Sequence, residues 1–121
     1  MARILIVDDD PVVLDLVRDL LLIQGHSVAS AVDGAQALAK LGAEAFELLI
    51  IDRNMPVMDG IAAVKALRRE SRLAALKVLM FTSSGDPAVR EEALRAGVDG
   101  FLRKPIQMQE FSATINGVLA R

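Results

Sequence analysis

The chain has no cysteine, no tryptophan and no tyrosine, and its only histidine is His26. Without cysteine there is no disulfide, no thiolate metal site and no cysteine nucleophile, and a single histidine excludes a multi-histidine site. Aromatic residues make up only 3% of the chain and the formal net charge is −2, which argues against a nucleic-acid surface. We therefore expect no direct contact with nucleic acid.

Long apolar runs are also missing at the start of the chain, where Ile4–Val7 is followed at once by three aspartates. Such a start fits neither a signal peptide nor a membrane span, so we expect a cytoplasmic protein without a membrane partner. No repeat, low-complexity tract or linker interrupts the 121 residues. We expect one domain over residues 1–121.

Short β-rich apolar runs alternate with helical stretches along the whole chain. This alternation predicts an α/β, doubly wound three-layer fold, with a parallel sheet between two layers of helices. We expect strands at 3–8, 27–32, 48–52, 77–82 and 99–102, and helices at 11–24, 34–42, 60–70, 87–96 and 107–120. Aspartates that could serve as helix N-caps stand at 10, 33, 59 and 86, and glycines that could end helices stand at 25, 42 and 97.

Polar side chains follow four of the five predicted strands. The aspartates at 8–10 follow the first strand, Asp52 ends the third, Thr82 ends the fourth and Lys104 follows the fifth. Because the carboxyl ends of parallel strands lie at one edge of a sheet, these side chains should meet at one site. Each also has an ordinary reading: Asp10 as an N-cap, Thr82 as a strand-end hydroxyl, Lys104 as part of a turn. Their joint occurrence favours a phosphoryl-transfer site.

Asp8, Asp9 and Asp52 would form a carboxylate cluster at that edge. Carboxylates at contact distance repel by about 1 to 4 kcal/mol per pair, so a fold that retains such a cluster usually neutralises it with a hard cation. Mg²⁺ suits oxygen ligands that leave room for water and phosphate. The alternative is three unrelated aspartates at loop tips.

Two further patterns could serve a partner protein. Lys65, Arg68, Arg69 and Arg72 share a helical face at i, i+3, i+4, i+7 spacing. They form either a solvated outer face or a docking surface for an acidic partner.

The predicted helix at 11–24 is apolar nearly all round. A stripe facing the sheet needs about half of its apolar residues. Leu14 and Leu22 should therefore stay exposed. They are either scattered surface leucines or part of a docking surface for a kinase or phosphotransfer helix beside the acidic pocket.

The chain resembles the receiver domain of two-component response regulators over its whole length. The matching stretches are ILIVDDD at 4–10, DRNMPVMDG at 52–60, FTS at 81–83 and ALRAGVDGFLRKP at 93–105. The resemblance implies a flavodoxin-like sheet of strand order 2-1-3-4-5. It also implies a Mg²⁺-dependent phosphorylation switch.

The resemblance implies a role for each residue of the cluster. Asp52 would be the phosphoacceptor, attacking a phosphohistidine on a partner and also contacting Mg²⁺. Asp9 would bind Mg²⁺ directly, Asp8 would bind it largely through water, and the backbone carbonyl of Asn54 would be a further ligand. Asn54 and Ser84 would occupy the positions that tune the lifetime of the phosphate.

By the same resemblance, Lys104 would pair with the phosphoryl oxygens and Thr82 would hydrogen-bond the attached phosphoryl group. That contact would let Phe101 turn inward, and the Lys104–Pro105 bond would be cis.

The partners implied are a sensor histidine kinase or histidine phosphotransfer protein, and a downstream protein target or fused output domain. The chain would be a monomer or a weak dimer. It would signal through the face built from its fourth helix, fifth strand and fifth helix, and would catalyse only its own phosphorylation and dephosphorylation.

Two other phosphate-related folds fit less well. A haloacid-dehalogenase-type phosphatase would use the aspartates at 8–10, Thr82 and Lys104, but it needs an acidic pair beyond its lysine, and no Asp follows Asp99. It would also leave Asp52 without a role. A flavodoxin-like electron carrier would need a phosphate-binding loop of Ser, Thr and Gly where this chain has aspartates, and an aromatic residue to stack on a flavin.

A receiver-shaped interaction module that no longer accepts phosphate is the third alternative. Loss of Asp9, Asp52 or Lys104 would indicate it, and all three residues are present.

Overall fold

A parallel sheet of five strands, in the order β2-β1-β3-β4-β5, forms the centre of the protein. The computed structural model describes residues 1–55, 57–82 and 85–120, so Ser83 and Ser84 lie outside the described residues. The strands are β1 (Arg3–Val7), β2 (Ser27–Ala31), β3 (Leu48–Asp52), β4 (Lys77–Thr82) and β5 (Gly100–Arg103). The helices are α1 (Pro11–Ile23), α2 (Gly34–Ala43), α3 (Gly60–Arg68), α4 (Pro87–Ala96) and α5 (Met108–Leu119), with a short 3-10 helix η1 (Ser71–Leu73).

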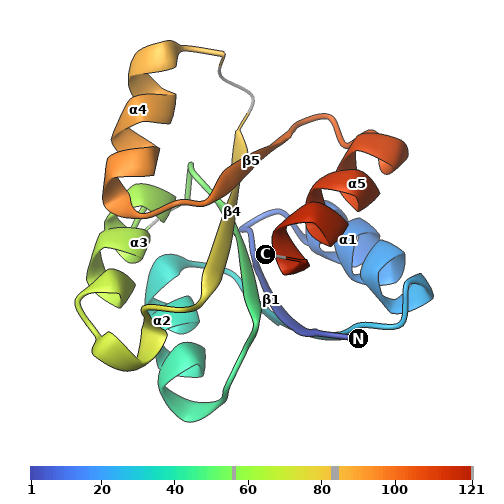
Figure 1. Ribbon diagram of the computed structural model, residues 1–121, viewed down its shortest axis with the longest axis horizontal. Helices are drawn as coiled ribbons and strands as arrows, with labels where there is room; N and C mark the ends of the chain where they lie inside the picture. Colours follow the sequence, from blue (N-terminus) through green and yellow to red (C-terminus); the bar gives the residue numbers. More distant parts are fainter. Residues whose placement is uncertain (56, 83–84, 121) are drawn as a thin grey trace.

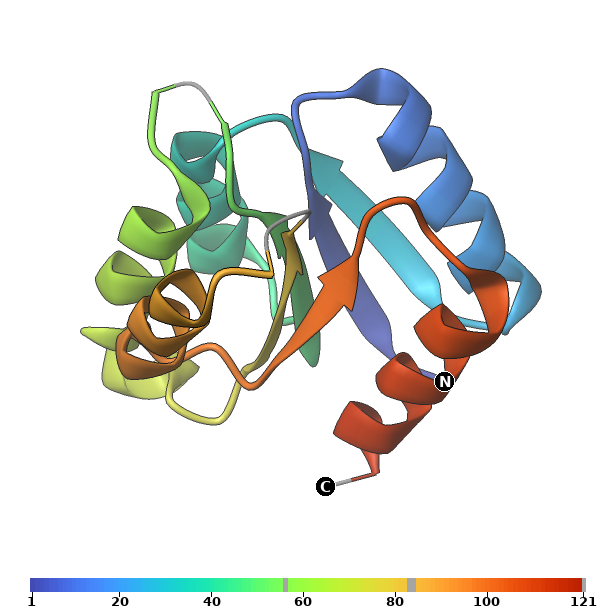
Figure 2. The same cartoon turned by 90° about the horizontal axis from the view of Figure 1, so that it is seen from above.

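The helices cover both faces of the sheet, as the alternating pattern predicts. Figures 1 and 2 show α2, α3 and α4 on one face and α1 and α5 on the other. Strand residues alternate between the two cores: Leu49 and Ile51 of β3 pack with the first group, Leu48 and Ile50 with the second. All four are fully buried, which explains why the central strands are apolar without a break. The predicted fold class and strand order are confirmed.

Aspartate N-caps hold the start of α1, α2, α3 and α4, whereas α5 begins without a side-chain cap. Asp10 accepts a hydrogen bond from the N–H of Val12 at 2.9 Å, and the aspartates at 33, 59 and 86 accept equivalent bonds. The four predicted N-caps are confirmed.

The predicted helix ends are confirmed in two of three cases. Gly25 and Gly97 have φ of +90° and +115°, the left-handed conformation that ends a helix. The prediction for Gly42 is wrong, because α2 continues to Ala43 and the extended backbone of Glu44 ends it.

The outer face of α1 differs from the prediction at one residue. Leu22 is exposed as expected, but Leu14 is only 9% exposed. Leu14 lies three and seven residues before Val17 and Leu21, so it belongs to the same buried stripe. The exposed apolar residues of α1 are Val12, Leu16, Leu22 and Ile23, at 73%, 47%, 51% and 83% exposure.

The basic residues of the predicted stripe on α3 do not act as a set. Arg68 donates hydrogen bonds to the carbonyls of Gly97 at 2.8 Å and Leu73 at 3.0 Å, and it pairs with Asp99 at 3.2 Å. Its guanidinium therefore ties the end of α3 to η1 and to the turn between α4 and β5. Arg72 also binds within the fold, to the carbonyl of Leu41 at 2.8 Å. The prediction of a solvated face is wrong for Arg68, whose side chain is only 18% exposed, and holds for Arg72, whose side chain is 52% exposed. Long side chains at the end of a helix can reach unpaired carbonyls of neighbouring elements, which explains both contacts.

Among the described residues, no helix has the length and apolar character needed to cross a bilayer.

Candidate functional site

Two aspartates and a lysine meet at the carboxyl edge of the sheet. Asp8 follows β1, and Asp52 is the last residue of the neighbouring strand β3. Both are buried, with 0% and 6% of their surface exposed. Lys104, from the loop after β5, places its Nζ 2.9 Å from Asp8 Oδ2 and 3.3 Å from Asp52 Oδ2. The ammonium thus bridges two carboxylates that come from residues 44 positions apart in the sequence.

Asp8 is held by backbone contacts as well as by the lysine. Its Oδ1 accepts a hydrogen bond from the N–H of Asp10 at 2.9 Å, and its own N–H donates to the carbonyl of Ala31 at 3.2 Å. Asp10 itself uses its carboxylate as the N-cap of α1. The ordinary reading of Asp10 is therefore correct, and its carboxylate is engaged in the cap.

Asp9 completes an acidic group that could hold a metal ion. Asp8, Asp9 and Asp52 each offer a carboxylate oxygen, and these oxygens lie within 4.8 Å of one another. Asp9 is exposed whereas the other two are buried, so the group opens to solvent on the side of Asp9. Three carboxylates and the single ammonium of Lys104 leave two negative charges uncompensated, which favours a divalent cation.

The pKa values of Asp52 and of Lys104 are both raised above their usual values. Burial raises the pKa of the Asp52 carboxyl, and the charge of Asp8 raises it further, against the opposing effect of Lys104. Burial alone would lower the pKa of Lys104, but its hydrogen bond to Asp8 and the charge of Asp52 outweigh it, so the pKa is raised. Lys104 therefore remains an ammonium at neutral pH.

Two residues of the segment that leads from β3 into α3, Gly60 and Val57, have unusual backbone geometry close to Asp52 in the chain. A Cβ on Gly60 would lie 2.3 Å from the carbonyl oxygen of Asp52, so only glycine allows this close approach. Val57 has φ of +71°, in the left-handed region that β-branched residues rarely adopt. The N–H of Asn54 contacts the Asp52 carboxylate. Asn54 is the fourth residue of the predicted metal set.

Thr82 and Phe101 lie on the adjacent strands β4 and β5. Thr82 is the last residue of β4 and is 5% exposed; its carbonyl accepts a hydrogen bond from the N–H of Lys104 at 3.3 Å. Phe101 is half-buried. The Lys104–Pro105 peptide bond is cis, as expected from the resemblance.

One neighbour of Phe101 could not be found from the sequence. The guanidinium carbon of Arg90, on α4, lies 4.9 Å from the centroid of the Phe101 ring. Helical spacing places Arg90 on a side of α4 but does not say which residue of the next strand it meets. No sequence signal identifies this contact.

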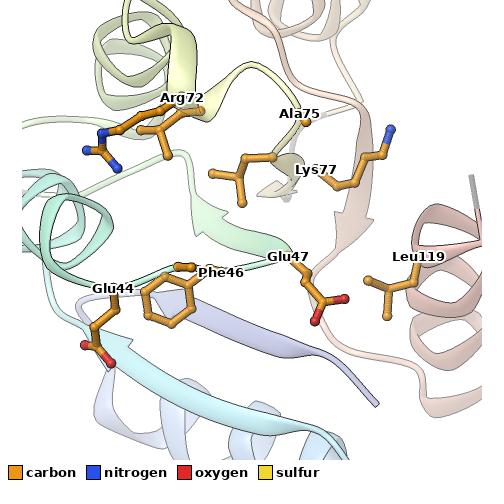
Figure 3. A pocket seen from close by; sticks show the side chains of 10 residues that line it. Glu44, Phe46, Glu47, Arg72, Ala75, Lys77 and Leu119 are labelled. Atoms are coloured by element: carbon orange, nitrogen blue, oxygen red, sulfur yellow. The ribbon is translucent and has the colours of Figure 1, made fainter.

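A cavity lies at the amino edge of the sheet, opposite the edge that holds Asp8, Asp52 and Lys104. It has a volume of about 530 Å³, and its lining, shown in Figure 3, includes Glu44, Phe46, Glu47, Arg72 and Lys77. Two of its charged groups are already paired, Glu44 with Arg3 and Arg72 with Glu70. It contains none of the predicted site residues, so cavity size and the predicted site indicate opposite edges of the sheet.

Comparison with known proteins agrees with this geometry. The profile of the response regulator receiver domain matches residues 4–116. The chain is 36% identical, over 121 residues, to the DNA-binding dual master transcriptional regulator RpaA of Synechocystis, covering all of this chain and 50% of that protein. The chain spans about half the length of the curated relatives it matches.

Solved structures show the same fold over nearly the whole chain. The chemotaxis response regulator CheY4 of Vibrio cholerae superimposes with a TM-score of 0.94 at 36% identity, covering 98% of each chain. The receiver domain of the sensor histidine kinase PA1611 of Pseudomonas aeruginosa has a TM-score of 0.91 at 25% identity and covers 99% of this chain and 98% of its own. That structure has a magnesium ion in its active-site cleft. The chain thus belongs to the family of response regulator receiver domains of two-component signalling.

Proposed function

We propose that this receiver domain is a phosphorylation switch whose phosphoacceptor is Asp52. The single observation that carries the proposal is the Lys104 ammonium, which bridges the buried carboxylates of Asp52 and Asp8 at 3.3 Å and 2.9 Å. A buried carboxylate beside a fixed cation is suited to nucleophilic attack on phosphorus, because the cation stabilises charge on the transferred oxygens. The donor is a phosphohistidine on a sensor histidine kinase or a histidine phosphotransfer protein.

The transfer exchanges one bond to phosphorus for another. An oxygen of the Asp52 carboxylate forms the new P–O bond, the P–N bond of the phosphohistidine breaks, and the imidazole leaves with the electron pair and takes up a proton. Lys104 is within reach of the product oxygens, since it already contacts Asp52. Hydrolysis by water returns the Asp52 carboxylate and inorganic phosphate. The chain in this role is a signalling switch that catalyses only these two reactions on itself.

The acidic group fits Mg²⁺ by the chemistry of its donors, which are all oxygen atoms. Asp9, Asp52 and the backbone carbonyl of Asn54 would hold the ion directly, and Asp8 would hold it through water. Each oxygen of Asp8 accepts one hydrogen bond, from the Asp10 N–H or from Lys104, and keeps a second lone pair that can accept from a water of the ion. When bound, Mg²⁺ supplies positive charge that draws the phosphoryl oxygens towards Asp52.

The upstream partner meets the outer face of α1. This helix begins at Pro11, directly after the aspartates, and leaves Val12, Leu16, Leu22 and Ile23 exposed. Val12 and Leu16 lie in the first two turns of α1, nearest the aspartates, and two more apolar side chains follow along the helix, which favours a docking surface over scattered leucines. A helix of the histidine-bearing partner could bury this surface while it presents its phosphohistidine to Asp52.

The downstream signal passes through Thr82 and Phe101 to the α4-β5-α5 face. Thr82 hydrogen-bonds the phosphoryl group, and Phe101 turns inward in response. Phe101 has no hydroxyl, so the change is one of packing. The face then binds a protein target or an output domain of the same protein. The chain acts in the cytoplasm, as a monomer or a weak dimer, without direct contact with nucleic acid.

The test is the intact mass after incubation with acetyl phosphate, with and without Mg²⁺. We expect a Mg²⁺-dependent gain of one phosphoryl group on the wild type and none on Asp52→Asn. Asp59→Asn is the matched control: it changes an aspartate of the loop that follows β3 but keeps an N-cap for α3, and it should gain the group as the wild type does.

Two outcomes would overturn the proposal. A wild type that gains no mass, even with rapid sampling, would be a phosphate-independent interaction module. An adduct that persists in Asp52→Asn would make Asp8 the nucleophile, as in the dehalogenase-type alternative.

A further inference from the structure

A basic cavity beside the phosphoacceptor site shares Thr82 and Lys104 with that site, but its two arginines have no role in the chemistry above. It has a volume of about 300 Å³ and opens between the amino end of α4, the end of β5 and the start of α5. Three of its lining residues carry positive charge, namely Arg90, Arg103 and Lys104, against one acidic residue, Glu110. The whole chain has a net charge of −2, so this concentration of positive charge is local.

The two arginines of the cavity are the cations that remain available. Lys104 is committed to Asp8 and Asp52. Arg103 meets Glu110 at 3.5 Å, with 67% and 43% of the two side chains exposed, and an exposed pair at that distance is weak. Arg90 is half-buried, and within the described ranges no carboxylate lies at ion-pair distance from it.

Arg90 is positioned by an aromatic ring. Its guanidinium lies over the face of Phe101, 4.9 Å from the centroid, which keeps a cation at the mouth of the cavity without neutralising it. Phe101 is also the residue that turns inward in the proposed switch. The environment of Arg90 therefore changes with the state of Asp52.

The geometry points to an acidic segment of the downstream partner as the occupant of this cavity, with its carboxylates on Arg90 and Arg103. This inference rests on the proposed function, because it takes the α4-β5-α5 face as the output surface. Arginine presents paired N–H donors that match a carboxylate, and one or two acidic side chains suit a cavity of this volume. Inward rotation of Phe101 removes the ring from Arg90, so the guanidinium becomes free to bind the partner and the affinity rises.

The experiment measures binding of a hexaglutamate peptide, blocked at both ends, by titration calorimetry at low salt. Wild-type protein is titrated with Mg²⁺ alone and with Mg²⁺ and beryllofluoride, which mimics the phosphoryl group on a carboxylate. Loss of a cation–π contact at a partly exposed site corresponds to an affinity about two- to fivefold higher in the beryllofluoride state. Hexaglutamine should not bind.

The variants are Arg90→Gln and Arg103→Gln, with Arg95→Gln as the matched control. Arg95 lies on α4 as Arg90 does, pairs with Glu91 and does not line this cavity. All three variants lose one positive charge. We expect the first two to weaken peptide binding about fivefold or more, and Arg95→Gln to bind as the wild type does.

Several results would overturn the inference. Equal weakening by Arg95→Gln would show a general charge effect. Equal peptide affinity with and without beryllofluoride would show that binding in the cavity does not depend on phosphorylation of Asp52. Full displacement of the peptide by millimolar inorganic phosphate would identify a small-anion site instead of a protein surface. The phosphoryl mass gain of the wild type is measured separately: a missing adduct refutes the phosphoacceptor, and missing peptide binding beside a normal adduct refutes only the acidic partner.

Discussion

Replacing Asp9 with alanine should raise the melting temperature of the metal-free protein. The carboxylate oxygens of Asp9, Asp8 and Asp52 lie within 4.8 Å of one another. At that separation two like charges repel by about 3.5 kcal/mol at an effective dielectric constant of about 20 and by about 0.9 kcal/mol in bulk water. Asp9 is exposed, so the lower figure applies to each of its two repulsions, and the ammonium of Lys104 offsets part of them.

Removing the Asp9 carboxylate should therefore stabilise the metal-free protein by about 1 kcal/mol. For a chain of 121 residues this corresponds to a rise in the melting temperature of about 3–5 °C. With Mg²⁺ the order should reverse, because the wild type gains binding free energy on folding and Asp9→Ala loses a ligand. The assay is differential scanning calorimetry in EDTA and in Mg²⁺.

Asp19→Asn is the control for this prediction, because asparagine removes the charge and has about the same helix propensity as aspartate. Asp19 is an exposed aspartate of α1 that has no ion pair among the residues that the structure describes, and its removal changes the net charge by the same amount. It should leave the melting temperature close to that of the wild type under both conditions. If Asp9→Ala melts at or below the wild type in EDTA, the carboxylates are not in mutual repulsion and the reasoning is refuted.

Three further changes test other parts of the structure. Val57→Asn should stabilise the protein by about 1 kcal/mol in urea unfolding, because asparagine tolerates the φ of +71° and the exposed valine buries little; lower stability would contradict strain at this position. Arg68→Gln should cost about 1–3 kcal/mol, since partly buried carbonyls such as that of Gly97 lose their partner, and a loss below about 0.5 kcal/mol would show that water replaces it. Burial lowers the pKa of His26, whose Nδ1 accepts the N–H of Ala2 at 3.0 Å, so the folded state favours the neutral ring. Its contribution to stability should be complete above pH 6.5 and should be lost as the pH falls through the lowered pKa; the urea midpoint of the wild type should therefore fall between pH 7.5 and 5.5 by more than that of His26→Gln.

Local patterns in the sequence predict most of the fold. The bounds of β3, β4 and α4 agree with the structure at both ends, because a buried apolar run and an Asp-Pro helix start are short-range signals. The sequence also predicts that Asp8, Asp52 and Lys104 meet, because the carboxyl ends of parallel strands lie at one edge of the sheet.

The errors occur where orientation or long side chains decide the structure. In α1 nearly every position is apolar, so the pattern does not indicate which side faces the sheet, and the prediction of an exposed Leu14 is wrong. Arg68 and Arg90 reach partners 29 and 11 positions along the chain, Gly97 and Phe101. Such contacts depend on how helices pack against each other, which spacing within one helix does not determine.

The hydrogen bonds of Arg68 also constrain how α4 can move. They fasten the carbonyl of Gly97, at the carboxyl end of α4, to α3, whereas the amino end of α4 adjoins the segment after Thr82. A rigid helix that is held at one end pivots about that end when its other end is displaced. Pro87 lies ten residues from Gly97, about 15 Å along the axis, so a tilt of about 10° displaces it by about 2.6 Å while Gly97 stays in place. Arg68 would therefore hold the pivot of α4, and the same tilt would move Arg90, seven residues from Gly97, by about 1.8 Å.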